Sequence, residues 1–169
     1  MNGPAVGAGV TSSACCDYVL SVPEATFWTP FKALGITPEG CSSVTFPERY
    51  GKDFSTTMLE KGEKTSAEYC RSAGFVDEIV EGGHTALLER AHEVANEWIA
   101  AGKQRPSIAS GEVERYRAIN KAESGELANA LISKAFVNNL MVTAQNRKQT
   151  GMAWAFWFVG MLQPVWSKL

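Results

Sequence analysis

The sequence predicts an α/β fold in which short strands and helices alternate in the first half and helices alone form the second. Two observations support this prediction. Short stretches of strand-forming residues, bounded by proline or glycine, recur before residue 81. From Thr85 onward, apolar residues recur at helical spacing instead. A chain of 169 residues suits one domain with a sizeable core and is short for two independent domains.

The first half contains several short elements. Pro23 and Pro30 are each expected to end a strand, because proline cannot donate a hydrogen bond to a neighbouring strand. Pro47 is expected to interrupt a helix that begins at Ser42 or Ser43. The predicted order is a glycine-rich turn at 6–10, a short helix at 10–16, strands at 17–21 and 25–28, a loop at 31–43, a helix from 42 or 43 to 46, helices at 54–61 and 65–73, and a strand at 75–80.

Two of these helices have predicted ends. Asp53 is expected to cap the first of them and Gly62 to close it, since a carboxylate accepts from the first amides and glycine adopts the left-handed turn. Thr65, followed three residues later by Glu68, matches a capping box for the second. Gly74 is expected to close that helix.

The second half is predicted to be helical from Thr85, with a break between Gly102 and Pro106. Later helices are expected near 108–124, 125–146 and 150–162. Pro164 is expected to stop the last helix and leave the tail exposed. The apolar face of the first helix is formed by Leu88, Ala91, Ala95, Trp98 and Ile99.

These patterns divide the chain into an α/β region at 1–84 and a helical region at 85–169. The longest apolar run, Met152 to Leu162, is shorter than the about 20 residues that cross a bilayer, so no membrane span is expected. The N-terminus shows no cationic segment followed by an apolar stretch, so no secretory signal is expected.

Composition excludes some classes of partner. The formal charge of −2 and the dispersed Lys and Arg residues give no basic footprint for nucleic acid. The four cysteines match no zinc pattern, so reduced thiols and no metal site are expected. His84 and His92 are expected at the surface or at a helix end rather than as ligands. The cysteines are Cys15, Cys16, Cys41 and Cys70.

The last three residues, Ser167, Lys168 and Leu169, form the tripeptide that the peroxisomal import receptor reads at a free C-terminus. Three specified residues would end a random chain only about once in several thousand cases. The sequence therefore predicts a peroxisomal location with the import receptor as a partner.

Two turns in the first half are candidate parts of a binding site. Gly7 and Gly9 flank Ala8 and would permit close approach of the backbone to a ligand, although tight packing of a helix on a sheet is the commoner reason for such a turn. Glu39 lies between Pro38 and Gly40, where an exposed turn glutamate is the commoner interpretation.

Some aromatic residues are further candidates for the lining of a binding site. For the C-terminal cluster, core packing is the commonest role, and an acyl tunnel or a subunit contact are alternatives. Phe27, Trp28 and Phe31 either border a pocket or belong to the core. The C-terminal cluster consists of Trp154, Phe156, Trp157, Phe158 and Trp166.

Three segments resemble the peroxisomal Δ3,Δ2-enoyl-CoA isomerases of the crotonase superfamily. They are NGPAVGAGVT at 2–11, FWTPFKALGITPEGCSSVTFP at 27–47 and MLEKGEKTSAEYCRSAGFVDEIV at 58–80. The resemblance implies a crotonase (ClpP/crotonase-like) fold of β-β-α turns, with residues 1–84 as the C-terminal part of its α/β core. It also implies that the helical region packs against other subunits, usually in a homotrimer. Family members carry a longer segment before NGPAVG, so the chain is predicted to be N-terminally truncated.

The resemblance also implies a reaction. An enoyl-CoA isomerase moves a double bond of an acyl-CoA from position 3 to position 2, in the β-oxidation of unsaturated fatty acids. Glu39 occupies the position of the proton-shuttling base, and the Ala8 amide that of an oxyanion donor. The CoA thioester is the substrate, and no cofactor is expected. The residues expected to contact the substrate are Gly7, Gly9, Phe31, Pro38 and Gly40.

Related hydratases use two glutamates, whose positions fall on Thr11 and Phe31 in this chain. Neither residue is a carboxylate, so the sequence favours an isomerase, and a hydratase remains the less favoured alternative. A different class of function stays open as well. The chain would then be a non-catalytic crotonase-like subunit, or a truncated gene product, that associates with full-length partners.

Overall fold

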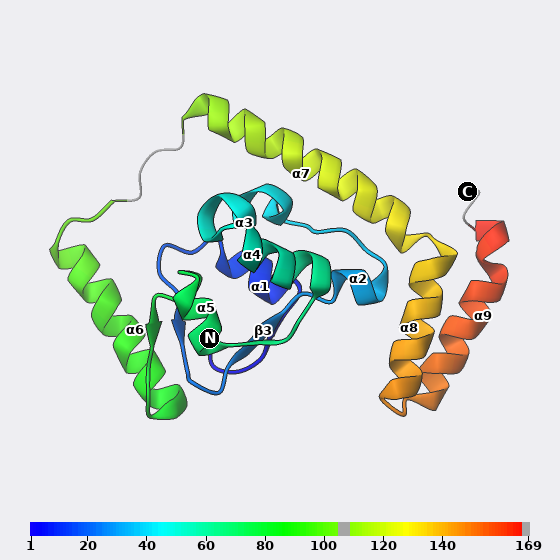
Figure 1. Ribbon diagram of the computed structural model, residues 1–169, viewed down its shortest axis with the longest axis horizontal. Helices are drawn as coiled ribbons and strands as arrows, with labels where there is room; N and C mark the ends of the chain where they lie inside the picture. The colour runs from blue at the N-terminus through cyan, green and yellow to red at the C-terminus, as the bar shows by residue number, and fades with distance from the viewer. Residues whose placement is uncertain (105–108, 167–169) are drawn as a thin grey trace.

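The computed structural model describes residues 1–104 and 109–166, with side chains in the last helix described as far as Leu162. Short strands and helices form the first half, and longer helices form the second (Figure 1). The elements in chain order are β1 (Ala5–Val6), α1 (Ala8–Ser13), β2 (Leu20–Ser21), β3 (Thr26–Trp28), α2 (Phe31–Leu34), α3 (Ser42–Tyr50), α4 (Lys52–Ser55), the π-helix η1 (Thr56–Lys61), β4 (Thr65–Ser66), α5 (Ala67–Ser72), β5 (Glu78–Ile79), α6 (Gly83–Ala100), α7 (Ser110–Leu131), α8 (Lys134–Asn146) and α9 (Thr150–Trp166).

The strands form two small sheets. In the first, β1 pairs in parallel with β3, placing Ala5 opposite Phe27, and β4 pairs antiparallel with the other side of β3. In the second, β2 and β5 pair in parallel, with Leu20 opposite Glu78. Each parallel pair joins strands that are separated by helices along the chain, as parallel pairing requires a crossover connection.

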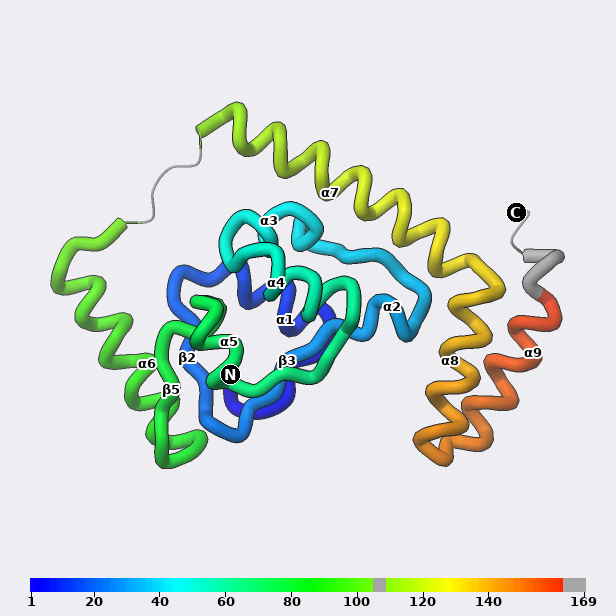
Figure 2. Tube along the Cα trace, viewed as in Figure 1, coloured from blue at the N-terminus to red at the C-terminus, as the bar shows by residue number. Residues whose placement is uncertain are grey.

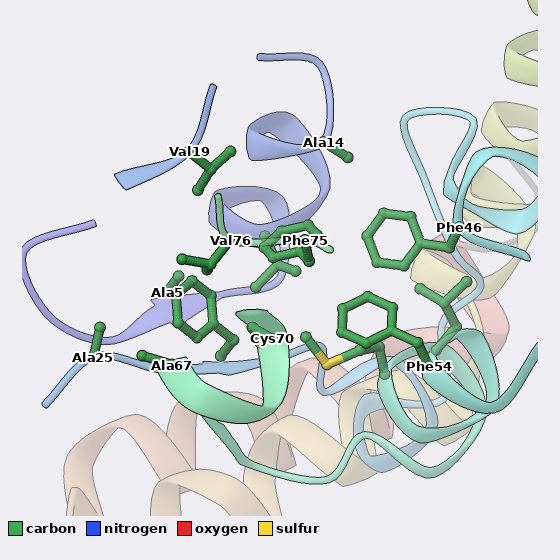
Figure 3. Packing of buried hydrophobic residues seen from close by; sticks show 14 of the residues in the cluster. Ala5, Ala14, Val19, Ala25, Phe46, Phe54, Ala67, Cys70, Phe75 and Val76 are labelled. Carbon is green, nitrogen blue, oxygen red and sulfur yellow. The ribbon is translucent and has the colours of Figure 1, made fainter. Parts of the chain in front are cut away.

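The core of the first half is built around aromatic rings (Figure 3). Phe75 lies 5.8 Å from Phe27 and 5.5 Å from Phe54, centroid to centroid. Phe46 joins them from α3, at 5.9 Å from Phe54. Burying each such ring removes a large apolar area from water, so this cluster fixes α3, α4 and β3 around one centre.

The helical half extends around this core and contributes Leu87 of α6 to it. Helix α6 packs beside β2, α7 crosses past α3, and α8 and α9 run alongside each other in opposite directions (Figures 1 and 2). Helix α8 also contacts α2 in the first half. Within the described ranges, no helix combines the length and apolarity needed to cross a membrane.

Several predicted boundaries are wrong. No break separates residues 124 and 125, because α7 continues through Gly125. The break between helices lies at Ile132–Ser133 instead. There the Ser133 hydroxyl caps α8 by accepting a hydrogen bond from the Phe136 amide at 3.1 Å. The predicted loop at 31–43 contains the short helix α2. The strand predicted at 75–80 is confined to β5, because the Phe75 and Val76 amides both donate to the Cys70 carbonyl of α5 and not to a neighbouring strand.

Two prolines do not act as predicted. Pro47 lies inside α3, which continues to Tyr50, since Phe46 and Tyr50 pack together at 5.7 Å and hold the helix past the missing amide. Likewise α9 continues to Trp166, so Pro164 does not end it. A proline removes a single amide donor, and the remaining backbone bonds of the helix can persist.

The predicted caps are displaced by one or two residues. Gly51, and not Asp53, precedes α4, and Asp53 lies in its first turn. Ser66, and not Thr65, caps α5, accepting from the Tyr69 amide at 3.2 Å. Gly62 does close its helix, with a φ of 66°.

Candidate active site

The turn that carries Glu39 has an unusual backbone. Glu39 is half-buried between α2 and α3, and its carbonyl accepts a hydrogen bond from the Ser42 amide at 3.2 Å. The next two residues, Gly40 and Cys41, are both left-handed, with φ of 67° and 63°. Glycine adopts this conformation without strain, but Cys41 does not, so other contacts must stabilise the turn.

The Glu39 carboxylate has one polar partner from another element. Thr11, which is only 3% exposed, donates its hydroxyl to Glu39 Oε1 at 2.7 Å. Gly40 lies beside the Thr11 side chain, which a Cβ at Gly40 would meet at an ordinary contact distance of 3.8 Å. One carboxylate oxygen is therefore held by α1, while Oε2 accepts no hydrogen bond from the described residues.

The Ala8 amide lies at the start of the same helix as Thr11. Gly7, with a φ of 54°, precedes the helix, and its carbonyl accepts from Val10 at 2.8 Å and from Thr11 at 3.1 Å. Among the described residues, none accepts a hydrogen bond from the Ala8 amide, and Ala8 is exposed. This amide is thus available to a ligand oxygen, in the region where Thr11 contacts Glu39.

The other predicted contact residues divide into two groups. Pro38 is half-buried and Gly40 exposed beside Glu39, while Gly7 and Gly9 flank Ala8. Phe31 instead lies in the hydrophobic core and is 3% exposed.

The predicted import signal, formed by Ser167, Lys168 and Leu169, lies outside the described residues.

Glu123, which the sequence did not mark as a candidate, contacts the turn that carries Glu39. This buried glutamate of α7 accepts from the Cys41 amide at 2.6 Å and from both the Ser43 amide, at 3.1 Å, and the Ser43 hydroxyl. The pKa of the Cys41 thiol is raised, mainly by burial and to a smaller extent by the nearby Glu123 charge. No local pattern marks Glu123, because its partners lie about 80 positions earlier in the chain.

Three residues of the C-terminal aromatic cluster are exposed, and Phe156 is half-buried. Trp154 is 68% exposed, and Trp157 and Phe158 are about half exposed. An apolar cavity of about 350 Å³ lies between α8 and α9, bordered by Met141, Trp154 and Trp157 among others. Core packing is therefore wrong for these three residues. The side chain of Trp166 lies outside the described part.

The histidines and cysteines show no ligand site. His84 and His92 are exposed on α6. Within residues 1–104 and 109–162, no three His, Cys, Asp or Glu side chains are grouped so that they could hold a metal ion. Proton transfer by Glu39, with the Ala8 amide as a hydrogen-bond donor, is the chemistry that this arrangement allows.

Similarity to known proteins decides the family. The sequence profile described as Enoyl-CoA hydratase/isomerase matches residues 1–149. The chain belongs to the enoyl-CoA hydratase/isomerase family. The predicted resemblance and the crotonase fold are both confirmed, and acyl-CoA is the kind of ligand that this family binds.

Individual relatives share only part of their length with this chain. It is 34% identical over 146 residues to enoyl-CoA delta isomerase 2 of Rattus norvegicus, covering 83% of this chain and 37% of that protein. It is 39% identical over 79 residues to testis-specific chromodomain protein Y 1 of Homo sapiens, covering 47% and 15%. An enoyl-CoA hydratase/isomerase structure from Pseudoalteromonas atlantica superposes with a TM-score of 0.72 at 27% identity, covering 88% and 60%. The chain thus spans a little over a third of the rat enzyme and well over half of the solved structure.

Proposed function

We propose that this family member is a Δ3,Δ2-enoyl-CoA isomerase that uses Glu39 as its only carboxylate base. The contact between the Thr11 hydroxyl and Glu39 Oε1, at 2.7 Å, carries the proposal. A hydratase would need a second carboxylate to activate water, and a threonine faces Glu39 instead. The other hydratase position, Phe31, is an apolar ring buried in the core.

The mechanism follows from the placement of these groups. Glu39 removes a proton from the carbon next to the thioester and returns it two carbons along, so the carboxylate is regenerated. The Thr11 hydroxyl holds Oε1, which leaves Oε2 to carry the proton. The Ala8 amide supports the negative charge that develops on the thioester oxygen, which is the largest stabilising contribution expected in such a reaction.

The first test replaces the base. Glu39→Gln keeps the shape of the side chain but cannot take up the proton, so kcat for a 3-enoyl-CoA should fall about a hundred- to ten-thousandfold. The conversion is followed by the absorbance of the conjugated 2-enoyl thioester. Glu24→Gln, at an exposed position between β2 and β3, serves as the matched control and should retain wild-type kcat. Equal rates in wild type and Glu39→Gln would refute the role of Glu39.

A non-catalytic role is the second candidate. Similarity to a protein named for its chromodomain favours it, since that name describes no reaction. In that case the chain would associate with longer family members, and well-folded wild-type protein would show no isomerase activity. The exposed aromatic side chains of α9 support association through the helical half, including the homotrimer that the family resemblance implies.

We also propose a peroxisomal location, on the basis of the C-terminal Ser-Lys-Leu, and a role in β-oxidation, on the basis of the resemblance to the isomerases. Deleting Leu169 should abolish recognition by the import receptor, because the receptor reads the complete tripeptide. A fluorescent protein fused ahead of the chain should then move from peroxisomes to the cytosol in cells. Unchanged punctate fluorescence in the deletion variant would rule the signal out.

A further inference from the structure

We propose that Glu123 of α7 is a positioning residue for the reaction, holding the turn that presents Glu39 to the substrate. The inference rests on the proposed function of Glu39. It adds a residue from the helical half to a site otherwise formed by the first half of the chain.

The contacts of Glu123 converge on the residues that immediately follow Glu39. One carboxylate oxygen accepts from the Cys41 amide at 2.6 Å, and the other accepts from the Ser43 amide at 3.1 Å and from the Ser43 hydroxyl. Hydrogen bonds to an ionised carboxylate are about twice as strong as neutral ones. These bonds offset the strain of Cys41, whose φ of 63° is unfavourable for a residue with a side chain.

The burial of Glu123 indicates a dedicated role. It is 6% exposed, and it is the only charged residue among the buried side chains that the structure describes. A buried carboxylate is costly unless its oxygens are hydrogen-bonded, and here three donors meet that need. The first amides of α3 also lie at the positive end of that helix, which favours a nearby negative charge.

Two further contacts hold α7 against the same region. The Cys41 thiol donates to the Tyr116 carbonyl at 3.4 Å, and Arg115 forms an ion pair with Glu48 of α3. The turn is therefore fixed from two sides. Thr11 holds the Glu39 carboxylate itself, and Glu123 holds the backbone two and four residues later.

The test compares Glu123→Gln with Glu126→Gln, an exposed glutamate on the same helix. Glutamine presents an NH₂ group where a carboxylate oxygen accepted, so at least one of the amide bonds is lost. We expect kcat to fall about tenfold with KM nearly unchanged, as the loss of a hydrogen bond to a charged group predicts. Glu126→Gln should match wild type in both parameters.

A double-mutant cycle separates positioning from general destabilisation. If Glu123 acts through Glu39, then Glu123→Gln should lower kcat no further in a Glu39→Gln background. Additive losses, or an unchanged kcat in the single variant, would overturn the inference. If Glu123→Gln fails to fold, Ser43→Ala removes one of the three donors, the hydroxyl, at an exposed position and should show a smaller loss that is likewise non-additive.

Hydrogen exchange distinguishes this inference from the proposed function. The Cys41 and Ser43 amides should exchange at least tenfold faster in Glu123→Gln than in wild type, whether or not the protein is active. Inactive wild type with faster exchange would refute the isomerase but keep Glu123 as the anchor of the turn. Active wild type with unchanged exchange at both amides would refute the anchor alone.

Discussion

At the scale of single residues, the Thr11 hydroxyl defines what Glu39 can do. It is buried, it contacts one carboxylate oxygen at 2.7 Å, and it belongs to the helix that also begins with the Ala8 amide. A single short helix thus orients the proposed base and supplies the proposed oxyanion donor. Their relative placement depends on α1 together with the turn that carries Glu39.

Replacing Thr11 tests this orientation. Thr11→Val keeps the shape of the side chain but removes the hydrogen bond to Glu39, and the loss of about 1.5 kcal/mol should lower kcat about tenfold. Thr11→Ser retains the hydroxyl and should recover most of the rate. Steady-state isomerase kinetics on the three proteins provide the measurement. Equal kcat in Thr11→Val and wild type would show that the contact does not orient the base.

At the scale of elements, α6 is tied to β5 by a polar cluster. Arg90 Nε lies 2.9 Å from Glu78 Oε1, and the Tyr18 hydroxyl donates to Glu78 Oε2 at 3.1 Å. The hydrogen bond from Arg90 is the main reason that the pKa of Glu78 falls below its ordinary value of 4.5. The cluster fixes the first helix of the second half beside the sheet formed by β2 and β5.

This cluster predicts a pH dependence of stability. Because the pKa of Glu78 is lower in the folded protein, the carboxylate contributes stability above pH 4.5, and this contribution is lost as the pH falls through the folded value. Glu78→Gln should therefore be less stable than wild type at pH 7, and the difference should shrink toward pH 3. Urea unfolding of both proteins at several pH values gives the free energies. A difference that stays constant with pH would contradict the ion pair.

Sequence and structure agree best where the functional residues are close neighbours in the chain. Glu39, Pro38 and Gly40 lie in one turn that the sequence marked as a candidate. Glu123 could not be found in this way, because a single glutamate in an amphipathic helix looks like a solvated residue until α7 is placed against α3. The cap of α5 was misplaced by one residue because the Thr65 hydroxyl donates to the Phe27 carbonyl at 2.9 Å in the sheet.

At the scale of the whole molecule, a compact core carries Glu39 while the helical half extends around it (Figure 2). The contacts of Glu123 show that α7 takes part in the candidate site. The pair formed by α8 and α9 instead exposes Trp154, Trp157 and Phe158. The sequence could predict that these aromatics exist, but their exposure depends on how α9 packs on α8, which periodicity alone does not specify.

Product analysis of the wild-type protein incubated with a 3-enoyl-CoA tests the central claim most directly. We expect 2-enoyl-CoA to accumulate without 3-hydroxyacyl-CoA, since Thr11 replaces the second carboxylate that hydration would need. Glu39→Gln should form neither product at a comparable rate. Separation of the thioesters by chromatography gives both yields in one experiment. Formation of 3-hydroxyacyl-CoA, or no conversion by well-folded wild-type protein, would contradict the proposal that this chain is a one-glutamate isomerase.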